Sequence, residues 1–239
     1  MSVIPLRRDV HYPESDGKPM GETEVHIREI MYLLQALDEH LRTRADVYVG
    51  ADMLLYYVEG NPKQFVVPDV FVTLGVSRGQ RRIYKLWDEG APPTLIVEVT
   101  SDSTRNEDLS RKKELYQRLG VREYFLYDPL KDYLDPALQG FRLVNGRYLP
   151  IPLRPGGELV SETLGAAFRI EERGVRVVDG ATGKPILSDE EVRAAQRADA
   201  ERISRLEAEI ERLRGLAESR ESRDSKDSRD SRDDRDSRP

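Results

Sequence analysis

Two carboxylates stand out because of where they fall in the hydrophobic pattern of the chain. Asp69 follows Pro68 at the start of the apolar run 70–74, and Glu98 is the only charge inside the apolar run 95–99. An unpaired ionised carboxylate is costly to bury, so Glu98 indicates a compensating partner. Mg²⁺ prefers oxygen ligands and takes one or two protein carboxylates, while water and substrate phosphate complete its octahedron. These two acids therefore predict a Mg²⁺ site, which Mn²⁺ would also occupy.

A lysine on the next element would complete such a site. Thr104 and Glu107 have the spacing of a capping box, and residues 105–119 have the pattern of a helix closed by Gly120. Lys112 lies two turns into this helix. One strand-to-helix connection would return its ammonium towards the buried acid, where it would stabilise charge on a phosphate or orient an attacking water.

Asp108 precedes Lys112 by one helical turn, at i and i+4. The sequence leaves two interpretations of this pair open. It is either an ion pair on the helix surface or a contact in which Asp108 holds the lysine in place.

The strings around these residues resemble a known family. They are Pro68-Asp69, then VEVTSDST at 97–104, then EDLSRKKELYQRLGVREYFLYDP at 107–129. Together they resemble the Uma-type family of restriction endonuclease-like proteins, which belongs to the PD-(D/E)XK nuclease superfamily. The resemblance covers about residues 20–170, and the combined string is far more specific than Pro-Asp alone.

The resemblance implies Mg²⁺-dependent cleavage of nucleic acid. By the superfamily pattern the Asp is Asp69, and the (D/E)XK triplet begins at Glu98, so Thr100 stands where a lysine is expected. The family places that lysine on the next helix, which Lys112 matches better than its neighbour Lys113. Many nucleases of the superfamily act as dimers because cutting two strands needs two sites, so we expect a homodimer or higher homo-oligomer.

Composition narrows the remaining classes. The chain has no Cys and three His, which excludes a disulfide framework and disfavours a zinc cluster. No apolar stretch approaches the roughly 20 residues of a membrane-spanning helix, and the N-terminus lacks the apolar core of a signal peptide. We therefore expect a cytoplasmic protein without a membrane partner. The formal net charge of −6 argues against a protein that coats nucleic acid nonspecifically.

Changes of pattern along the chain divide it into four segments. Residues 1–21 form an irregular arm, 22–187 a restriction endonuclease-like domain, 188–218 a helical or coiled-coil segment, and 219–239 a disordered Ser/Arg/Asp tail. The order of helix, three strands, helix and strand predicts an α/β fold. The resemblance implies that its core is restriction endonuclease-like, with a mixed central sheet flanked by helices. Short Gly-punctuated runs at 140–178 predict further strands.

The first helix is expected to start at the cap Thr23 and to reach about Leu41. Its apolar residues recur at steps of three and four and predict a buried stripe. The stripe comprises Ile27, Ile30, Met31, Leu34, Leu37 and Leu41. The acids at its start, Glu22, Glu24 and Glu29, either interact favourably with the helix dipole or add a metal or water contact. His26 is interpreted as a surface or core histidine rather than a catalytic base.

The segment SRGQRRIYK at 77–85 is the most basic part of the predicted domain. It is either a solvated loop anchored by Trp87 or a phosphate grip in which an aromatic side chain stacks on a base. The candidate nucleic-acid contacts are Arg78, Arg81, Arg82 and Lys85.

Beyond residue 188 a short heptad seam runs through Ile203, Leu206, Ile210 and Leu213, and polar residues interrupt it upstream. Two heptads are too few for a stable isolated coil, so we expect weak self-association or packing against the body of the protein. From 219 onwards seven basic residues balance seven acids, and aliphatic and aromatic residues are absent. This composition favours a spacer over a DNA-binding tail.

Three function classes stay open. The first is an endonuclease that hydrolyses phosphodiester bonds of nucleic acid, with DNA the favoured substrate, in which Asp69 and Glu98 hold Mg²⁺ and Lys112 supports the attacking water. The second is a nucleic-acid-binding or regulatory module that kept the fold without efficient catalysis, consistent with Thr100 and the acidic net charge. The third is an assembly or adaptor protein that acts through its C-terminal helix.

Overall fold

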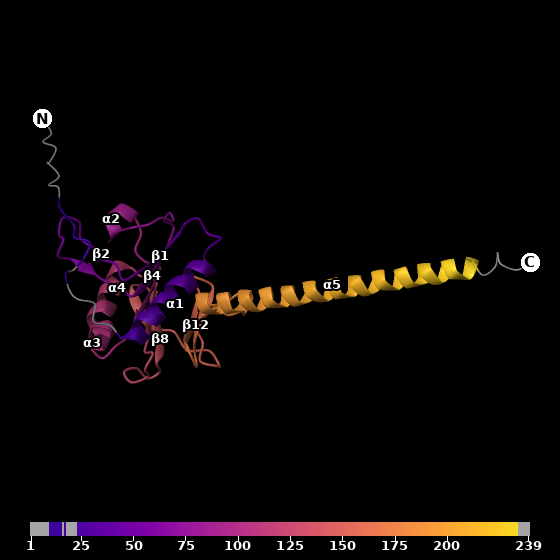
Figure 1. Ribbon diagram of the computed structural model, residues 1–239. Coiled ribbons are helices and arrows are strands. Elements are labelled where there is room, and N and C mark those ends of the chain that lie inside the picture. The colour runs from indigo at the N-terminus through magenta and orange to yellow at the C-terminus, as the bar shows by residue number, and fades with distance from the viewer. Residues whose placement is uncertain (1–9, 16, 18–22, 234–239) are drawn as a thin grey trace, which may run out of the picture. The chain divides into compact units, whose positions relative to one another are not determined.

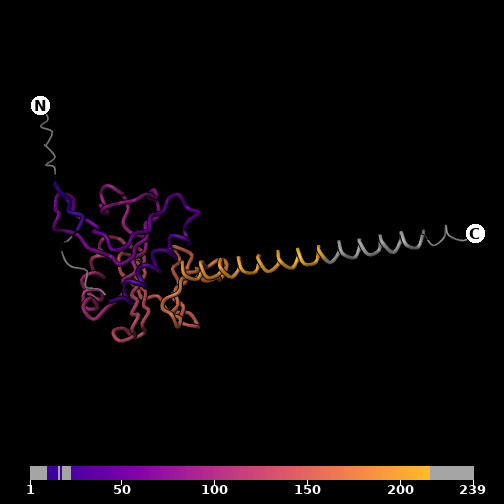
Figure 2. Tube along the Cα trace, viewed as in Figure 1, coloured from indigo at the N-terminus to yellow at the C-terminus, as the bar shows by residue number. Residues whose placement is uncertain are grey.

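The computed structural model describes residues 10–15, 17 and 23–233, and the side chains among them up to residue 215. Residues 1–9, 16, 18–22 and 234–239 lie outside the described part. They include parts of the predicted arm and tail, and Glu22 of the predicted domain. The chain divides into two compact units, residues 1–188 and 189–239. Figures 1 and 2 trace the chain through both.

A six-stranded sheet forms the centre of the first unit. Its strands follow the order β1-β4-β6-β7-β8-β9. Their bounds are Val47–Ala51 for β1, Val70–Leu74 for β4, Leu95–Val99 for β6, Glu123–Tyr127 for β7, Leu138–Val144 for β8 and Arg147–Pro150 for β9. The pair β6–β7 is parallel, because a helical crossover joins them, and every other neighbouring pair of this sheet is antiparallel. The predicted mixed sheet is confirmed.

Smaller elements surround this sheet. The strands β2 (Leu55–Tyr56), β3 (Phe65–Val66) and β5 (Tyr84–Lys85) form one small sheet, and β10 (Leu159–Ser161), β11 (Ala166–Glu171) and β12 (Gly174–Asp179) form another. The short helix α2 (Leu86–Glu89) follows β5 directly. Within the described residues no helix combines the length and hydropathy that a membrane span requires.

Strand alternation divides the core into two layers. Val70, Val72 and Val97 face the helix α1 (Glu24–His40), which lies across β1 and β4 (Figure 1). Phe71 and Ile96 face the opposite layer, where the helix after β6 packs. Because successive side chains of a strand alternate between the faces of a sheet, Glu98 points to the same side as Ile96. The buried acid therefore lies beneath the helix that carries the candidate lysine.

The first helix begins at its predicted cap, since the Thr23 side chain accepts a hydrogen bond from the His26 backbone. The predicted buried stripe is wrong at two positions, because Ile27 and Met31 are 45% and 55% exposed. Instead the helix turns His26 and Glu29 inward, ahead of Leu33, Ala36 and Leu37. Apolar periodicity alone misses this rotation because the two inward polar residues find partners in the fold.

The predicted helix at 105–119 is confirmed, with a break in its regularity. It consists of α3 (Arg105–Glu107), the π-helical turn η1 (Asp108–Lys112) and α4 (Lys113–Leu119). Gly120 ends it at φ 83°, in the left-handed region that glycine adopts readily. Single π turns inside α-helices are frequent at functional sites.

The predicted capping box at the start of this helix is wrong. Thr104 has helical dihedral angles, and its side chain caps no helical N–H. Its hydroxyl accepts a hydrogen bond from the Ser101 backbone instead, at 3.1 Å. Glu107 pairs with Arg111 one turn later rather than reaching back to the cap. The Ser101–Thr104 turn therefore takes the Thr104 hydroxyl and Arg111 takes the Glu107 carboxylate, so neither group caps the helix.

The second unit contains the helix α5 (Asp189–Asp233). None of its side chains up to residue 215 is buried within the unit as described. Its bounds include part of the segment for which the sequence predicts disorder, residues 219–239. That disorder, the four segment boundaries and the oligomeric state stay predictions.

Candidate active site

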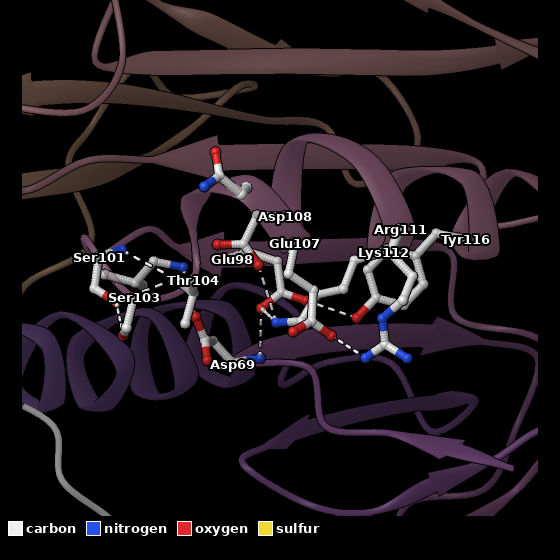
Figure 3. Close-up of polar contacts among 12 residues, drawn as sticks. Asp69, Glu98, Ser101, Ser103, Thr104, Glu107, Asp108, Arg111, Lys112 and Tyr116 are labelled. Atoms are coloured by element: carbon white, nitrogen blue, oxygen red, sulfur yellow. Dashed lines mark hydrogen bonds and ion pairs between the residues drawn. The ribbon is translucent and has the colours of Figure 1, made fainter.

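The Glu98 carboxylate is the centre of a buried polar cluster (Figure 3). The side chain has no solvent exposure. Its Oε2 accepts hydrogen bonds from the Lys112 ammonium at 2.9 Å and from the Asp69 backbone N–H at 3.3 Å. Its Oε1 accepts a hydrogen bond from the Tyr116 hydroxyl at 2.6 Å. The helix after β6 thus contributes two donors, and the segment before β4 one donor, to a single carboxylate on strand β6.

Asp69 is joined to Glu98 by a reciprocal pair of hydrogen bonds. While the Asp69 N–H donates to Glu98, the Asp69 Oδ2 accepts from the Val99 N–H at 2.7 Å. This crossing arises because β4 and β6 are antiparallel neighbours with Val70 opposite Val97, so Asp69 and Glu98 come next in register. The Asp69 side chain is 21% exposed. It is therefore the acid of the pair that solvent reaches.

The Lys112 ammonium lies between two acids. Besides its bond to Glu98, Nζ is 3.1 Å from Asp108 Oδ1, a contact that is an ion pair without the alignment of a hydrogen bond. Because the Asp108 side chain is only 1% exposed, the interpretation of this pair as a helix-surface ion pair is wrong. Asp108 instead holds the ammonium from within the same helix.

Burial and charge shift the titration of the whole cluster. Burial raises the pKa of Glu98 well above its ordinary value, against the opposing effect of Lys112, and burial likewise raises the pKa of Asp108. Burial disfavours the charged form of Lys112, but the neighbouring Glu98 and Asp108 carboxylates outweigh it and raise the pKa of the lysine. Lys112 therefore stays protonated at neutral pH, as a fixed positive charge.

The donor set fits a hard divalent cation. Three carboxyl groups, those of Asp69, Glu98 and Asp108, act electrostatically on the one Lys112 ammonium, so the acids outnumber the cation. The acids offer only oxygen atoms, which suit Mg²⁺ or Mn²⁺ better than zinc. In the part of the chain that the structure describes, no three His, Cys, Asp or Glu residues form a group that could hold a metal. An ion here would accordingly rely on two carboxylates, with water and substrate completing its shell.

The sequence analysis did not identify two residues of the cluster, Tyr116 and His26, as site residues. Tyr116 lies one turn after Lys112 on the same helix face, so its i+4 spacing was an available signal. His26 is 3% exposed, with Nε2 at 3.7 Å from Asp69 Oδ2. Nothing in the apolar pattern of the first helix indicated that this histidine points inward.

The Thr100 and Lys113 side chains do not join the contacts around Glu98. Thr100 is buried directly after β6, its N–H donates to the Tyr127 carbonyl at 2.7 Å, and its hydroxyl has no hydrogen-bond partner among the described residues. The Lys113 ammonium lies over the Phe141 ring, 3.4 Å from its centroid. Of the two adjacent lysines, Lys112 is thus the one that contacts Glu98.

The two acids of the first helix have other partners. Glu24 forms an exposed ion pair with Arg28 at 2.7 Å. Glu29 is buried and accepts a hydrogen bond from the Val175 N–H of β12 at 3.2 Å. Burial raises the pKa of Glu29 to about 7. Glu29 thus ties α1 to β12, and a metal or water contact of either acid stays a prediction.

Arg78 of the basic segment binds the end of α1. Its guanidinium donates to the carbonyl groups of Arg44 and Leu41 at 2.9 Å each and pairs with Asp38 at 3.1 Å. Those carbonyls lie at and just beyond the C-terminus of the helix, where a cation is favourable. These contacts give Arg78 a structural role.

The other cations of this segment also have acidic partners. Arg81 grips Glu89 through two hydrogen bonds of 2.6 and 2.8 Å and lies over the Tyr48 ring at 4.1 Å. The remaining pairs are Arg82 with Glu14 and Lys85 with Asp88. The Arg82 side chain is 81% exposed, the most accessible of the four. Nucleic-acid contact by these residues stays a prediction.

Comparison with known proteins identifies the family. The family model described as "Uma2: Putative restriction endonuclease" matches residues 4–171. Among solved structures, a similar chain is that of "a putative nuclease belonging to DUF820 from Anabaena variabilis", with 13% sequence identity and a TM-score of 0.46, covering 62% of this chain and 76% of that chain. The curated proteins gave no match. Because the family model spans well over half of the sequence, the chain belongs to the Uma2 family.

Proposed function

We propose that this protein is a metal-dependent endonuclease that hydrolyses phosphodiester bonds of nucleic acid, with DNA as the substrate and Mg²⁺ as the ion. One observation supports the proposal above all. The Glu98 carboxylate accepts hydrogen bonds from both the Asp69 backbone and the Lys112 ammonium. Two acids and a lysine from three separate segments thus meet at one point. The chain that carries them also matches the Uma2 family model, whose description is that of a restriction endonuclease.

Asp69 and Glu98 would hold the ion between them. Bound there, Mg²⁺ would supply Lewis-acid polarisation of the scissile phosphate and a lowered pKa for its bound water. Glu98 is fully buried and Asp69 partly exposed, so the phosphate would approach from the Asp69 side.

Lys112 acts as a fixed charge in this scheme. Because Glu98 and Asp108 raise its pKa, the ammonium does not give up its proton at neutral pH and is not a general base. It would instead stabilise negative charge that develops on the phosphate and orient the water that attacks it. Asp108 and Tyr116 position this pair, the first by contact with Lys112 and the second by contact with Glu98.

A cleavage assay tests the proposal. Wild-type protein is incubated with supercoiled plasmid and with single-stranded DNA, in Mg²⁺, Mn²⁺ or EDTA. The variant is Asp69→Asn, because asparagine retains an oxygen that accepts from Val99 and removes only the charge. Asp46→Asn is the matched control, since Asp46 is exposed and pairs with Arg44 outside the cluster.

We expect nicking by wild type and Asp46→Asn that requires metal, and loss of nicking in Asp69→Asn. Equal cutting by both variants would trace the activity to a contaminating nuclease. Absence of cutting on both substrates in both metals would contradict the proposal.

A second candidate function is a nucleic-acid-binding module without catalysis. It is favoured by Thr100 at the expected lysine position and by the engagement of both Glu98 oxygens with Lys112 and Tyr116. This candidate predicts that the same DNA shifts in a gel with wild-type protein but is not cut in any metal. Binding and cleavage measured on the same DNA therefore distinguish the two candidates.

A further inference from the structure

The helix α5 carries an apolar stripe that its own unit leaves open. Ile203, Leu206, Ile210 and Leu213 are each between 50% and 56% exposed. They recur at steps of three and four residues, so they lie on one side of the helix. Four large aliphatic side chains in line on a helix rich in charged residues indicate a binding surface.

The residue types on this stripe favour a particular partner. In heptad notation Ile203 and Ile210 occupy a positions, and Leu206 and Leu213 occupy d positions. Isoleucine at a with leucine at d is the combination that favours parallel, two-stranded coiled coils. A second copy of the same helix presents the same knobs and holes.

Charges beside the stripe match the same arrangement. The g positions hold Arg202 and Glu209, and the e positions hold Glu207 and Arg214. In a parallel, in-register pair, each g residue faces the e residue five positions later on the other helix. Arg202 then meets Glu207 of the partner subunit, and Glu209 meets Arg214 of the partner subunit. Both contacts join opposite charges, and symmetry produces each of them twice.

We propose that α5 binds the α5 of a second copy of this chain as a parallel, in-register, two-stranded coiled coil. The inference stands apart from the nuclease proposal, because it uses no residue of the polar cluster. Its consequence for that cluster concerns only the number of sites in one assembly. Parallel helices join two N-terminal units at the same end, so each assembly holds two copies of the Asp69–Glu98–Lys112 site.

The dimer is expected to be weak. The uninterrupted stripe spans two heptads, and polar Gln196 and Asp199 occupy the preceding a and d positions. Short helices are marginal without tertiary support. Association should therefore depend on protein concentration within the range of sedimentation equilibrium.

The first test measures the mass of the full chain by sedimentation equilibrium. Leu206→Glu places a charge in the seam and should give monomer, with the circular dichroism of the first unit unchanged. Arg202→Glu alone places two acids opposite each other and should weaken dimerisation about tenfold. Each ion pair contributes a few tenths of a kcal/mol, the like-charge pair costs a similar amount, and the symmetric dimer contains the changed pair twice. The double variant Arg202→Glu with Glu207→Arg should restore the wild-type constant. Arg205→Glu, a position off the seam, is the matched control.

The second test fixes the orientation, and the absence of cysteine from the chain gives it a clean background. Gln196→Cys lies at an a position, where two parallel helices bring identical residues together. It should form an inter-chain disulfide under mild oxidation, whereas Arg197→Cys, one residue off the seam, should not.

Three results would overturn the proposal. They are a monomeric wild type at every concentration, a dimer that survives Leu206→Glu, or a charge-swapped double variant that stays as weak as Arg202→Glu. Equal crosslinking of Gln196→Cys and Arg197→Cys would likewise exclude the in-register parallel arrangement. None of these readouts depends on nuclease activity.

Discussion

Replacing Lys112 by methionine should destabilise the first unit by leaving buried acids without their counter-charge. Methionine preserves the length and most of the volume of the side chain. It removes the only ammonium that contacts Glu98 and Asp108 among the described residues, and both acids are at most 1% exposed. What is lost is therefore chiefly the compensation of charge.

The expected size follows from known buried pairs. Removing one partner of a buried salt bridge costs about 3–5 kcal/mol, because the other charge stays buried and unpaired. For a unit of this size each kcal/mol lowers Tm by about 2–4 °C, which predicts a fall of about 6–20 °C. By contrast, Lys113→Met removes a lysine that lies on the Phe141 ring and should cost about 0.5–2 kcal/mol.

The loss should grow with pH. Burial already raises the pKa of Glu98 and Lys112 opposes that rise, so the variant raises the Glu98 pKa further. A carboxylate whose folded pKa is raised contributes stability below its unfolded pKa and loses it as the pH rises through the folded value. Lys112→Met should accordingly come closest to wild type near pH 5 and fall furthest behind it at pH 8.

Urea unfolding followed by circular dichroism, at both pH values and in EDTA, measures this. The double variant Lys112→Met with Glu98→Gln removes the stranded charge as well and should lose less stability than the two single variants added together. Destabilisation no larger than that of Lys113→Met, or a double variant whose losses simply add, would refute the assignment of Lys112 as the buried counter-charge.

Three further predictions concern neighbouring contacts. Tyr116→Phe removes the hydroxyl that donates to Glu98 and should lower the free energy of unfolding in urea by about 1–3 kcal/mol. Under the proposed function it should also move the thermal stabilisation by Mg²⁺ to higher pH. An unchanged pH midpoint of that stabilisation would contradict the contact. Gly174→Ala should cost about 2–4 kcal/mol in the free energy of unfolding, because the glycine is at φ +122° and a Cβ there would lie 2.0 Å from Glu29 Oε1. Gly183→Ala, at φ +68° and in open space, is the control for a positive-φ substitution without a close contact, and an equal loss in the two variants would contradict the role of Glu29. The stability of Glu29→Gln relative to wild type should rise by about 3 kcal/mol as the pH rises from 4.5 through about 7. The reason is that the raised pKa of Glu29 makes the ionised acid increasingly costly to keep folded in wild type. Urea unfolding that gives the same stability difference between the two proteins at pH 5 and at pH 8 would contradict this.

The sequence predicted the meeting of Asp69, Glu98 and Lys112 because each lies in an element with a clear period. A charge inside a β-branched run and a lysine on the next helix are local signals, and the sheet brings them together by register. The inward turn of His26 was not predictable in that way. It brings the ring to within 3.7 Å of Asp69, which lies more than forty residues later in the chain, and it requires a rotation of the helix that the hydropathy of Ile27 and Met31 argues against.

The π turn at Asp108–Lys112 was equally beyond the sequence pattern, although it contains both Asp108 and Lys112 of the polar cluster. An α-helix and a π turn have the same apolar residues, and only the extra residue per turn distinguishes them. The turn ends at Lys112 itself, so it helps to set where the ammonium lies relative to Glu98.

Thr100 and Lys112 show how a positive charge comes to lie beside Glu98 although position 100 lacks the expected lysine. Strand alternation gives position 100 the same facing as Glu98, which is why a lysine there would reach the acid directly. Here the side chain at that position is a threonine, and the ammonium comes to Glu98 from the helix that packs over the same face of the sheet. What electrostatic stabilisation requires is a positive charge near the phosphate and the acid, whichever element supplies it. Transplanting the lysine would test this equivalence: Thr100→Lys combined with Lys112→Met should recover stability that Lys112→Met loses, and a double variant as unstable as the single one would show that position 100 does not reach Glu98.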